Sequence, residues 1–249
     1  MSELMAQEQA MRAKLIGLVL AAMLVTSPAS AYDAYDPKNC IGIDWDDAHA
    51  VVAAQVIASP RVNFVKSPYD DDFKAAACPA ANAACRNASY LVSGDIVLSG
   101  RTVGEFTCVS YQSPSAKKPV WTRGWLPSTA LRPLAPAPAP ATSDWLGSWT
   151  QPGGTIEIAR GGLGGRLHVE GEMVVPTARD FHTGVLDAQV KPGTDTLAFL
   201  DDGWLPFETK CDSGCRVRMQ RVGPYLMVED NGDCGGAGVS FTGLYRRKN

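Results

Sequence analysis

The sequence predicts a mainly β protein made of two small antiparallel barrels, and three observations lead to this prediction. Short runs of β-branched and aromatic residues alternate with turns rich in glycine and proline along most of the 249 residues. An Ala/Pro-rich linker, residues 133–143, divides these runs into two sets. Such a linker favours an extended polyproline II conformation over helix or sheet. Four cysteines precede the linker and three follow it, as expected for small domains whose cores need covalent support.

Residues 1–31 have the pattern of a secretory signal peptide. Arg12 and Lys14 precede an apolar run of 11 residues, 15–25, and the segment ends in Ala29-Ser30-Ala31, a small-x-small cleavage pattern. The run is too short to span a bilayer as an anchor. We therefore expect a periplasmic or secreted bacterial protein with no membrane span in its mature chain. A buried N-terminal helix is the alternative interpretation.

The cysteines of an exported protein are expected to form disulfides. Loop positions predict three structural disulfides, namely Cys40–Cys108, Cys78–Cys85 and Cys215–Cys234. Cys211 is then the odd thiol, either free or paired between chains. Zinc is the competing interpretation of Cys211-x3-Cys215, but no histidine follows His182 and no pair of C-x2-C motifs is present. We therefore expect no metal site.

The net charge of the chain is −3. A nucleic-acid-binding protein needs lysine and arginine concentrated on one surface, so we expect no nucleic-acid partner. No glycine-rich phosphate loop follows a strand and opens a helix, and we expect no nucleotide or other cofactor.

The first domain is expected to cover residues 32–132, with an N-terminal extension before its strands. Residues 46–54 are compatible with one or two helical turns. The strands expected from β-branched and aromatic residues are Gln55–Ala58, Arg61–Val65, Tyr90–Val92, Asp95–Leu98 and Phe106–Tyr111.

Three motifs of this region resemble bacterial SH3-like domains. They are Val56-x-Ala58-x-x-Arg61-Val62-Asn63-Phe64, Tyr90-Leu91-Val92-x-Gly94-Asp95-x-Val97 and Gly124-Trp125-Leu126-Pro127-x-x-x-Leu131. The resemblance implies a small barrel with Trp125 packed inside. It also implies a peptide groove flanked by the candidate ligand-binding residues Tyr69, Tyr111 and Trp121. The insert Asp70–Arg86 departs from the family pattern at the position of a long loop near that groove.

The second domain, residues 144–249, is expected to be an antiparallel barrel. Its expected strands are Thr155–Ala159, Arg166–Gly171, Gly184–Val190, Thr196–Leu200, Cys215–Arg221, Tyr225–Glu229 and Val239–Arg246. Gly147-Ser148-Trp149 near the start, with an arginine near the end, resembles calycin barrels. In that family the arginine packs across the tryptophan and closes one end. The stretch Val228–Arg246 also resembles a module of uncharacterised exported bacterial proteins, some of which accompany lysozyme-inhibitor-like domains.

The sequence offers few candidates for catalysis, and we expect the protein not to be an enzyme. The only histidines are His49, His168 and His182, and none lies in a recognisable catalytic motif. Ser240 lies one residue away from a G-x-S-x-G pattern, and its surroundings alternate like those of a strand. The acidic runs Asp70–Asp72 and Asp201–Asp202 lie in loops, where neighbouring carboxylates are usually solvated. Residues 230–233 are interpreted as a turn because the spaced ligands of a calcium loop are absent.

These observations favour a non-catalytic binding protein of the cell envelope that recognises a cell-wall peptide or a protein partner. The alternative is a periplasmic inhibitor or immunity protein that blocks a cell-wall-degrading enzyme. A hydrolase with an unrecognised site is a third class.

Overall fold

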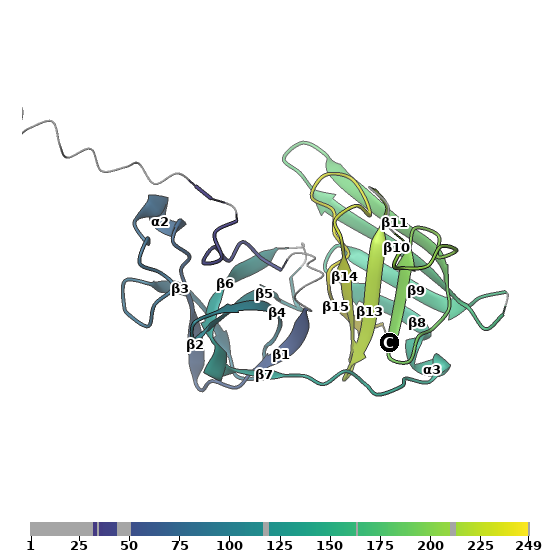
Figure 1. Ribbon diagram of the computed structural model, residues 1–249, viewed down its shortest axis with the longest axis horizontal. Coiled ribbons are helices and arrows are strands. Elements are labelled where there is room, and N and C mark those ends of the chain that lie inside the picture. The colour runs from purple at the N-terminus through teal and green to yellow at the C-terminus, as the bar shows by residue number, and fades with distance from the viewer. Residues whose placement is uncertain are drawn as a thin grey trace, which may run out of the picture. The chain divides into compact units, whose positions relative to one another are not determined.

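The computed structural model describes residues 32–33, 35–43, 51–116, 120–162, 164–209 and 213–248. Two antiparallel sheets contain about half of these residues, and both belong to one unit, Tyr35–Asn249 (Figure 1). The mainly β class predicted from the sequence is therefore confirmed. The expected signal peptide, His49 and Cys211 lie outside the described residues.

The first sheet contains seven strands in the order β3-β2-β6-β5-β4-β1-β7. The helix α2 (Asp70–Phe73) follows β2, and the 3-10 helix η1 (Ser128–Ala130) precedes β7. The strands are β1 (Val52–Val56), β2 (Arg61–Val65), β3 (Arg86–Val92), β4 (Ile96–Val103), β5 (Phe106–Gln112), β6 (Trp121–Pro127) and β7 (Leu131–Pro133).

Most of the expected strands of this sheet form, with longer or shifted ends. The helical turns suggested for residues 46–54 are wrong over 52–54, because Ala53 and Ala54 are buried strand residues of β1. Residues 44–50 lie outside the described part. The hairpin between β4 and β5 turns through Gly104 and Glu105, where Val103 pairs with Phe106. Gly104 has φ +57°, a left-handed conformation that glycine adopts without steric cost.

Two apolar clusters support the first sheet. The larger contains Ala54, Val56, Phe64, Leu91, Val97, Val109 and Leu126. The smaller surrounds Trp125, which is 0% exposed and packs with Phe106 and the disulfide Cys40–Cys108. The indole Nε1 of Trp125 donates a hydrogen bond to the carbonyl oxygen of Lys38 at 2.9 Å. Trp125 is thus a core residue of this sheet, as its motif implied.

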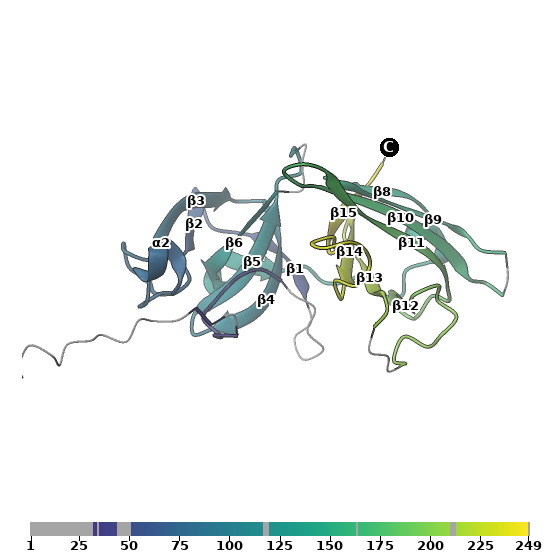
Figure 2. The same cartoon turned by 90° about the horizontal axis from the view of Figure 1, so that it is seen from above.

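The second sheet contains eight strands in the order β11-β10-β9-β8-β15-β14-β13-β12, preceded by helix α3 (Thr142–Trp145). Figure 2 shows how its long strands curve. The strands are β8 (Gly147–Gln151), β9 (Gly154–Arg160), β10 (Leu167–Pro176), β11 (Phe181–Val190), β12 (Thr196–Leu200), β13 (Arg216–Val222), β14 (Tyr225–Asp230) and β15 (Gly243–Arg247).

Alternate residues of all eight strands point into one apolar cluster, which includes Trp149 of β8 and Tyr245 of β15. The last strand begins later than expected, because residues 239–242 have no strand pairing. This segment is held instead by the buried carboxylate of Asp230, which accepts hydrogen bonds from Ser240 Oγ, the Phe241 backbone N–H and Thr242 Oγ1. Side-chain acceptors of this kind replace the hydrogen bonds of a sheet ladder.

Two arginine side chains pack against the ring of Trp149. The guanidinium groups of Arg221 and Arg247 lie 4.4 Å and 4.7 Å from the centroid of the Trp149 ring. Burial, followed by the neighbouring charge of Arg247, lowers the pKa of Arg221. Both contacts stabilise this end of the core by cation–π attraction.

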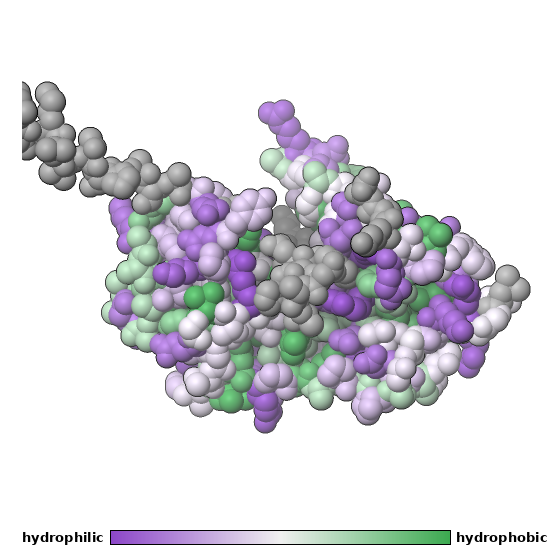
Figure 3. All heavy atoms as spheres, in the orientation of Figure 1, coloured by the Kyte–Doolittle hydropathy of each residue, from purple (hydrophilic) through white to green (hydrophobic). Residues whose placement is uncertain are grey.

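The three disulfides are Cys40–Cys108, Cys78–Cys85 and Cys215–Cys234, the pairs expected from the sequence. Polar and apolar residues are interspersed over the face seen in Figure 3. Among the described residues no helix is long and apolar enough to cross a membrane.

Candidate binding cleft

One wall of a cleft is formed by the face of the first sheet that points away from its main core. Leu98 of β4 pairs with Ser110 of β5, and Gln112 of β5 pairs with Trp121 of β6. Because side chains alternate along a strand, Ser110 and Gln112 share one face. The cross-strand partners Leu98 and Trp121 extend that face sideways.

The second wall is the outer face of the second sheet. Arg246 of β15 pairs with Thr150 of β8 on one side and with Tyr225 of β14 on the other. Leu244 lies two residues from Arg246 and therefore shares its face, whereas Tyr245 between them points into the core. The same alternation separates Arg246, at the cleft, from Arg247, which stacks on Trp149.

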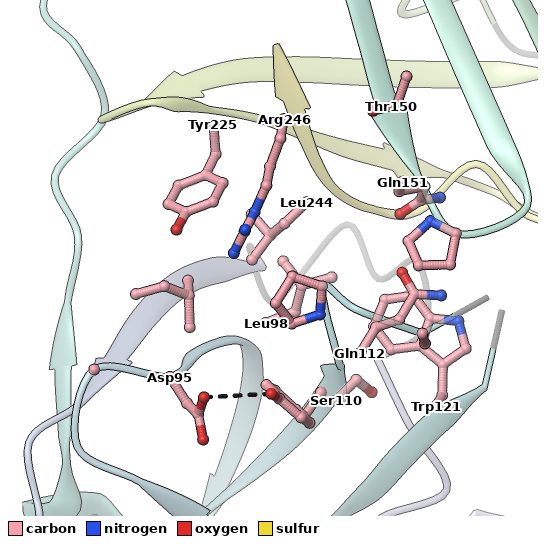
Figure 4. Close-up of a pocket in the computed structure, with 16 residues that line it drawn as sticks. Asp95, Leu98, Ser110, Gln112, Trp121, Thr150, Gln151, Tyr225, Leu244 and Arg246 are labelled. Atoms are coloured by element: carbon pink, nitrogen blue, oxygen red, sulfur yellow. Dashed lines mark hydrogen bonds between the residues drawn. The ribbon is translucent and has the colours of Figure 1, made fainter. Parts of the chain in front are cut away.

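The two walls enclose a cleft of about 300 Å³ (Figure 4). It adjoins a second hollow of about 220 Å³. The two hollows share Leu98, Ser110, Gln112, Trp121 and Gln151, so we treat them as one binding cleft. Its size is at the lower end of the range for small-molecule sites, roughly 300–1,000 Å³.

A buried contact between the sheets holds the walls in place. Glu229 of β14 is 5% exposed, and its Oε1 accepts a hydrogen bond from the backbone N–H of Val51 at 3.1 Å. The other oxygen, Oε2, accepts from Arg218 Nε at 2.8 Å. Both carboxylate oxygens are therefore paired, as a buried charge requires. An apolar cluster completes the contact with Val51, Ala53, Leu98, Val222 and Met227.

Two glutamine amides in the binding cleft each have one atom without a hydrogen-bond partner. Within the described residues, Gln112 Nε2 and Gln151 Oε1 are buried side-chain atoms without one. A buried donor or acceptor left unpaired costs about 1–3 kcal/mol. Gln151 is held against Gly243, where an added Cβ would lie within van der Waals overlap of its amide. The two glutamines come from β5 and β8, one from each sheet (Figure 4), and both residues line the two hollows.

Tyr111 and Asp95 form a hydrogen-bonded pair at one end of the binding cleft. The phenol of Tyr111 donates to Asp95 Oδ1 at 3.3 Å, the dashed line in Figure 4. Burial, the charge of Asp95 and this hydrogen bond raise the pKa of Tyr111, while Ser113 and the positive charge of Arg246 act in the opposite direction. Asp95 Oδ2 also accepts from the Val92 backbone N–H at 2.9 Å. Tyr111 is thus a neutral donor that already has an acceptor.

The structure brings together two of the three aromatic residues selected from the sequence. Tyr111 and Trp121 both line the binding cleft. Tyr69 does not line either hollow. Its phenol donates to Asp36 Oδ2 at 3.1 Å, and its ring packs edge-on against Phe73 at 5.6 Å. Tyr69 therefore anchors the loop that leads into the insert.

The histidines and serine considered for catalysis make local contacts. His168 Nε2 lies 2.8 Å from Asp187 Oδ1 on the adjacent strand, and His182 Nδ1 lies 2.5 Å from the carbonyl of Ala237. Ser240 bonds Asp230. In the described part of the chain, no group of three or more His, Cys, Asp or Glu side chains has a geometry that would hold a metal ion.

The acidic runs make local contacts, but Asp70–Asp72 form the start of helix α2 instead of the expected loop, whereas Asp201–Asp202 lie in the turn after β12. Asp70 Oδ2 accepts from the Ser67 N–H at 2.8 Å, and Asp71 forms an ion pair with Lys66 at 2.6 Å. In the second sheet, Asp201 Oδ1 accepts from the Cys215 N–H at 2.8 Å. These carboxylates shape the backbone around them.

Sequence patterns did not identify Gln112, Gln151, Tyr225 or Arg246 as cleft residues. They lie in separate strands of two sheets, and no motif or spacing connects them. The alternation of side chains along a strand predicts which residues of one wall share a face. It places Arg246 and Tyr245 on opposite faces of β15, but it does not predict that the faces of the two sheets meet.

No protein-family model, curated protein or solved structure matches this chain. The resemblances to SH3-like domains and calycin barrels therefore stay predictions from the sequence.

Proposed function

We propose that the protein is a non-catalytic binding protein of the bacterial cell envelope, and that the binding cleft takes a short cell-wall peptide. The observation that carries this proposal is the cleft itself. It is a partly open space of about 300 Å³ with Tyr111 and Trp121 in its lining and the unpartnered amide donor of Gln112 in one wall. Apolar and aromatic walls with a few convergent polar groups are the usual composition of a ligand site.

The disulfides support the location. Three disulfides in one chain are typical of extracellular or periplasmic proteins. The signal-peptide pattern of residues 1–31 adds the periplasm or the outside of the cell as the destination. A binding protein in that compartment meets the peptides of the cell wall.

Aromatic residues support a peptide ligand. Trp121 is partly buried between the walls, and its ring packs beside Leu98 and Leu244. A rigid aromatic side chain in such a position contributes much of the affinity in many complexes. Tyr225 adds a second ring from the opposite wall.

Calorimetric titration of the mature, oxidised chain with soluble muropeptides tests the proposal. We expect saturable binding, and we expect Trp121→Ala to weaken it by about 2 kcal/mol. The matched control is Trp204→Ala, because Trp204 is 55% exposed and lies outside both hollows. Absence of muropeptide binding, together with specific capture of one envelope protein, would contradict a peptide ligand and favour a protein partner.

A second candidate function is inhibition of a cell-wall-degrading enzyme. The loop after β12 exposes two large apolar residues in sequence, Trp204 and Leu205, at 55% and 53%. Arg166 lies over the Trp204 ring at 4.7 Å and helps to hold it. A presented aromatic residue of this kind is suited to anchor a partner. Inhibition of peptidoglycan hydrolysis that is lost in Trp204→Ala and kept in Trp121→Ala would favour this function over peptide binding.

A further inference from the structure

The binding cleft contains a positive charge that no carboxylate of the described chain neutralises. The guanidinium group of Arg246 extends from β15 into the cleft (Figure 4) and lies 5.5 Å from the centroid of the Tyr225 ring. This cation–π contact orients the group. None of the ion pairs found among the described residues includes Arg246.

The other two charges of the cleft are one negative and one positive, so the net charge of its lining stays positive. Three charged side chains line the two hollows, namely Asp95, Arg123 and Arg246. Asp95 already accepts hydrogen bonds from Tyr111 and from the Val92 backbone. Arg123, like Arg246, has no ion pair within the described residues. The available charge is therefore positive, and it favours an anionic group on the ligand.

The unpartnered amide donor of Gln112 defines a second requirement. Gln112 shares the cleft-facing side of β5 with Ser110, and its Nε2 is a buried donor. The Gln151 amide, by contrast, lies against Gly243 and the core residue Tyr245. A peptide carbonyl that accepts from Gln112 would remove the cost of leaving its donor unpaired.

These requirements identify a ligand class. We infer that the binding cleft recognises the carboxy-terminal end of a short peptide: Arg246 binds the free carboxylate, and Gln112 donates to a peptide carbonyl. Arginine and carboxylate form two parallel hydrogen bonds, a geometry that favours this pair over other anions and cations. The inference rests on the proposed function, since it specifies which part of a peptide the cleft selects.

The experiment compares two probes that differ only in the terminal charge, Nα-acetyl-Lys-D-Ala-D-Ala and its C-terminal amide. Calorimetry with the mature, oxidised chain should give an affinity about tenfold or more higher for the free acid. This difference should shrink as ionic strength rises, because salt screens charges that water can reach. Arg246→Gln should reduce the affinity for the acid to that of the amide. Arg160→Gln, which removes an exposed arginine of β9 outside both hollows, should leave both affinities unchanged.

A second variant tests the amide contacts independently of charge. Gln112→Leu should weaken the binding of acid and amide by the same factor, about fivefold. Thermal unfolding of each variant without ligand distinguishes a local effect from loss of the fold. Equal affinity for acid and amide in the unmodified chain would overturn the inference while leaving peptide binding intact. No binding of either probe or of muropeptides would overturn the proposed function as well.

Discussion

Trp125 and Trp121 lie four residues apart on β6, and truncating each should have opposite consequences. Trp125 is 0% exposed and packs against Phe106 and the Cys40–Cys108 disulfide. Trp121 is partly exposed and lines the binding cleft. Trp125→Ala should therefore lower stability, whereas Trp121→Ala should mainly weaken ligand binding.

The magnitude for Trp125 follows from its burial. A tryptophan side chain buries about 200 Å², and about 25 cal/mol per Å² gives ~5 kcal/mol of lost apolar transfer free energy. Loss of the indole donor would leave the Lys38 carbonyl without its 2.9 Å hydrogen bond, for about 1 kcal/mol more. Partial collapse of the cavity reduces the total, and we expect a loss of about 4–5 kcal/mol, near the upper end for such truncations.

The matched variants have smaller expected effects. Trp125→Phe keeps most of the apolar surface but removes the donor, and it should cost about 2 kcal/mol. Trp121→Ala should cost about 1–2 kcal/mol, because the ring packs against the cluster around Leu98 while part of it already faces water.

Urea unfolding of the oxidised proteins, followed by far-ultraviolet circular dichroism and by fluorescence, measures these free energies. Agreement of the two probes shows whether a two-state treatment applies. The reasoning would be refuted if Trp125→Ala lost less than about 2 kcal/mol, or if Trp121→Ala lost as much as Trp125→Ala.

Three further predictions concern the rest of the fold. Burial, followed by the charge of Asp230, raises the pKa of Tyr245 well above its usual value of 10.0, so this residue stabilises the folded state below pH 10 and loses that contribution as the pH rises further. Tyr245→Phe should reduce the loss of stability that urea titrations measure as the pH rises above 10. At pH 7 it should cost about 1 kcal/mol, because it removes the 3.0 Å hydrogen bond to the Phe241 carbonyl. An unchanged dependence of stability on alkaline pH would contradict this prediction. Replacing both Cys40 and Cys108 by alanine should lower stability by about 4 kcal/mol, because the two cysteines of this disulfide are 68 positions apart. Peptide mapping without reduction that linked either cysteine to another partner would show the pairing to be wrong. Limited proteolysis should cut between Leu134 and Ser143 and leave two folded fragments. The fragments should co-elute in gel filtration, because an apolar cluster joins the two sheets. A chain that resists cleavage in this segment would refute the prediction of two domains.

Much of the fold followed from local sequence signals. Runs of β-branched and aromatic residues between turns predicted strands such as Arg61–Val65 and Thr196–Leu200 with the bounds that they have in the structure. The signal failed at Val239–Thr242, where an alternating pattern is held as a loop by Asp230. A single buried carboxylate decided that conformation, and its partners lie outside any local window of sequence.

The linker shows a similar limit. Its Ala/Pro composition predicted an irregular segment, and residues 134–141 have no regular secondary structure. Composition did not predict that Leu134 N–H would donate to the Ala53 carbonyl at 2.8 Å, or Ala137 N–H to the Arg221 carbonyl at 2.7 Å. These bonds attach the linker at one point to each sheet.

The sequence by itself determined the β class and the three cysteine pairs, because residue preference for strands and loop position are local properties. It also selected Tyr111 and Trp121. Only the tertiary structure shows that Arg246, Gln112 and Gln151 line one cleft and that Tyr69 does not line it. A face of a sheet is readable from alternation, but the face that it meets depends on packing between residues far apart in the chain, here the contact of Glu229 with Val51.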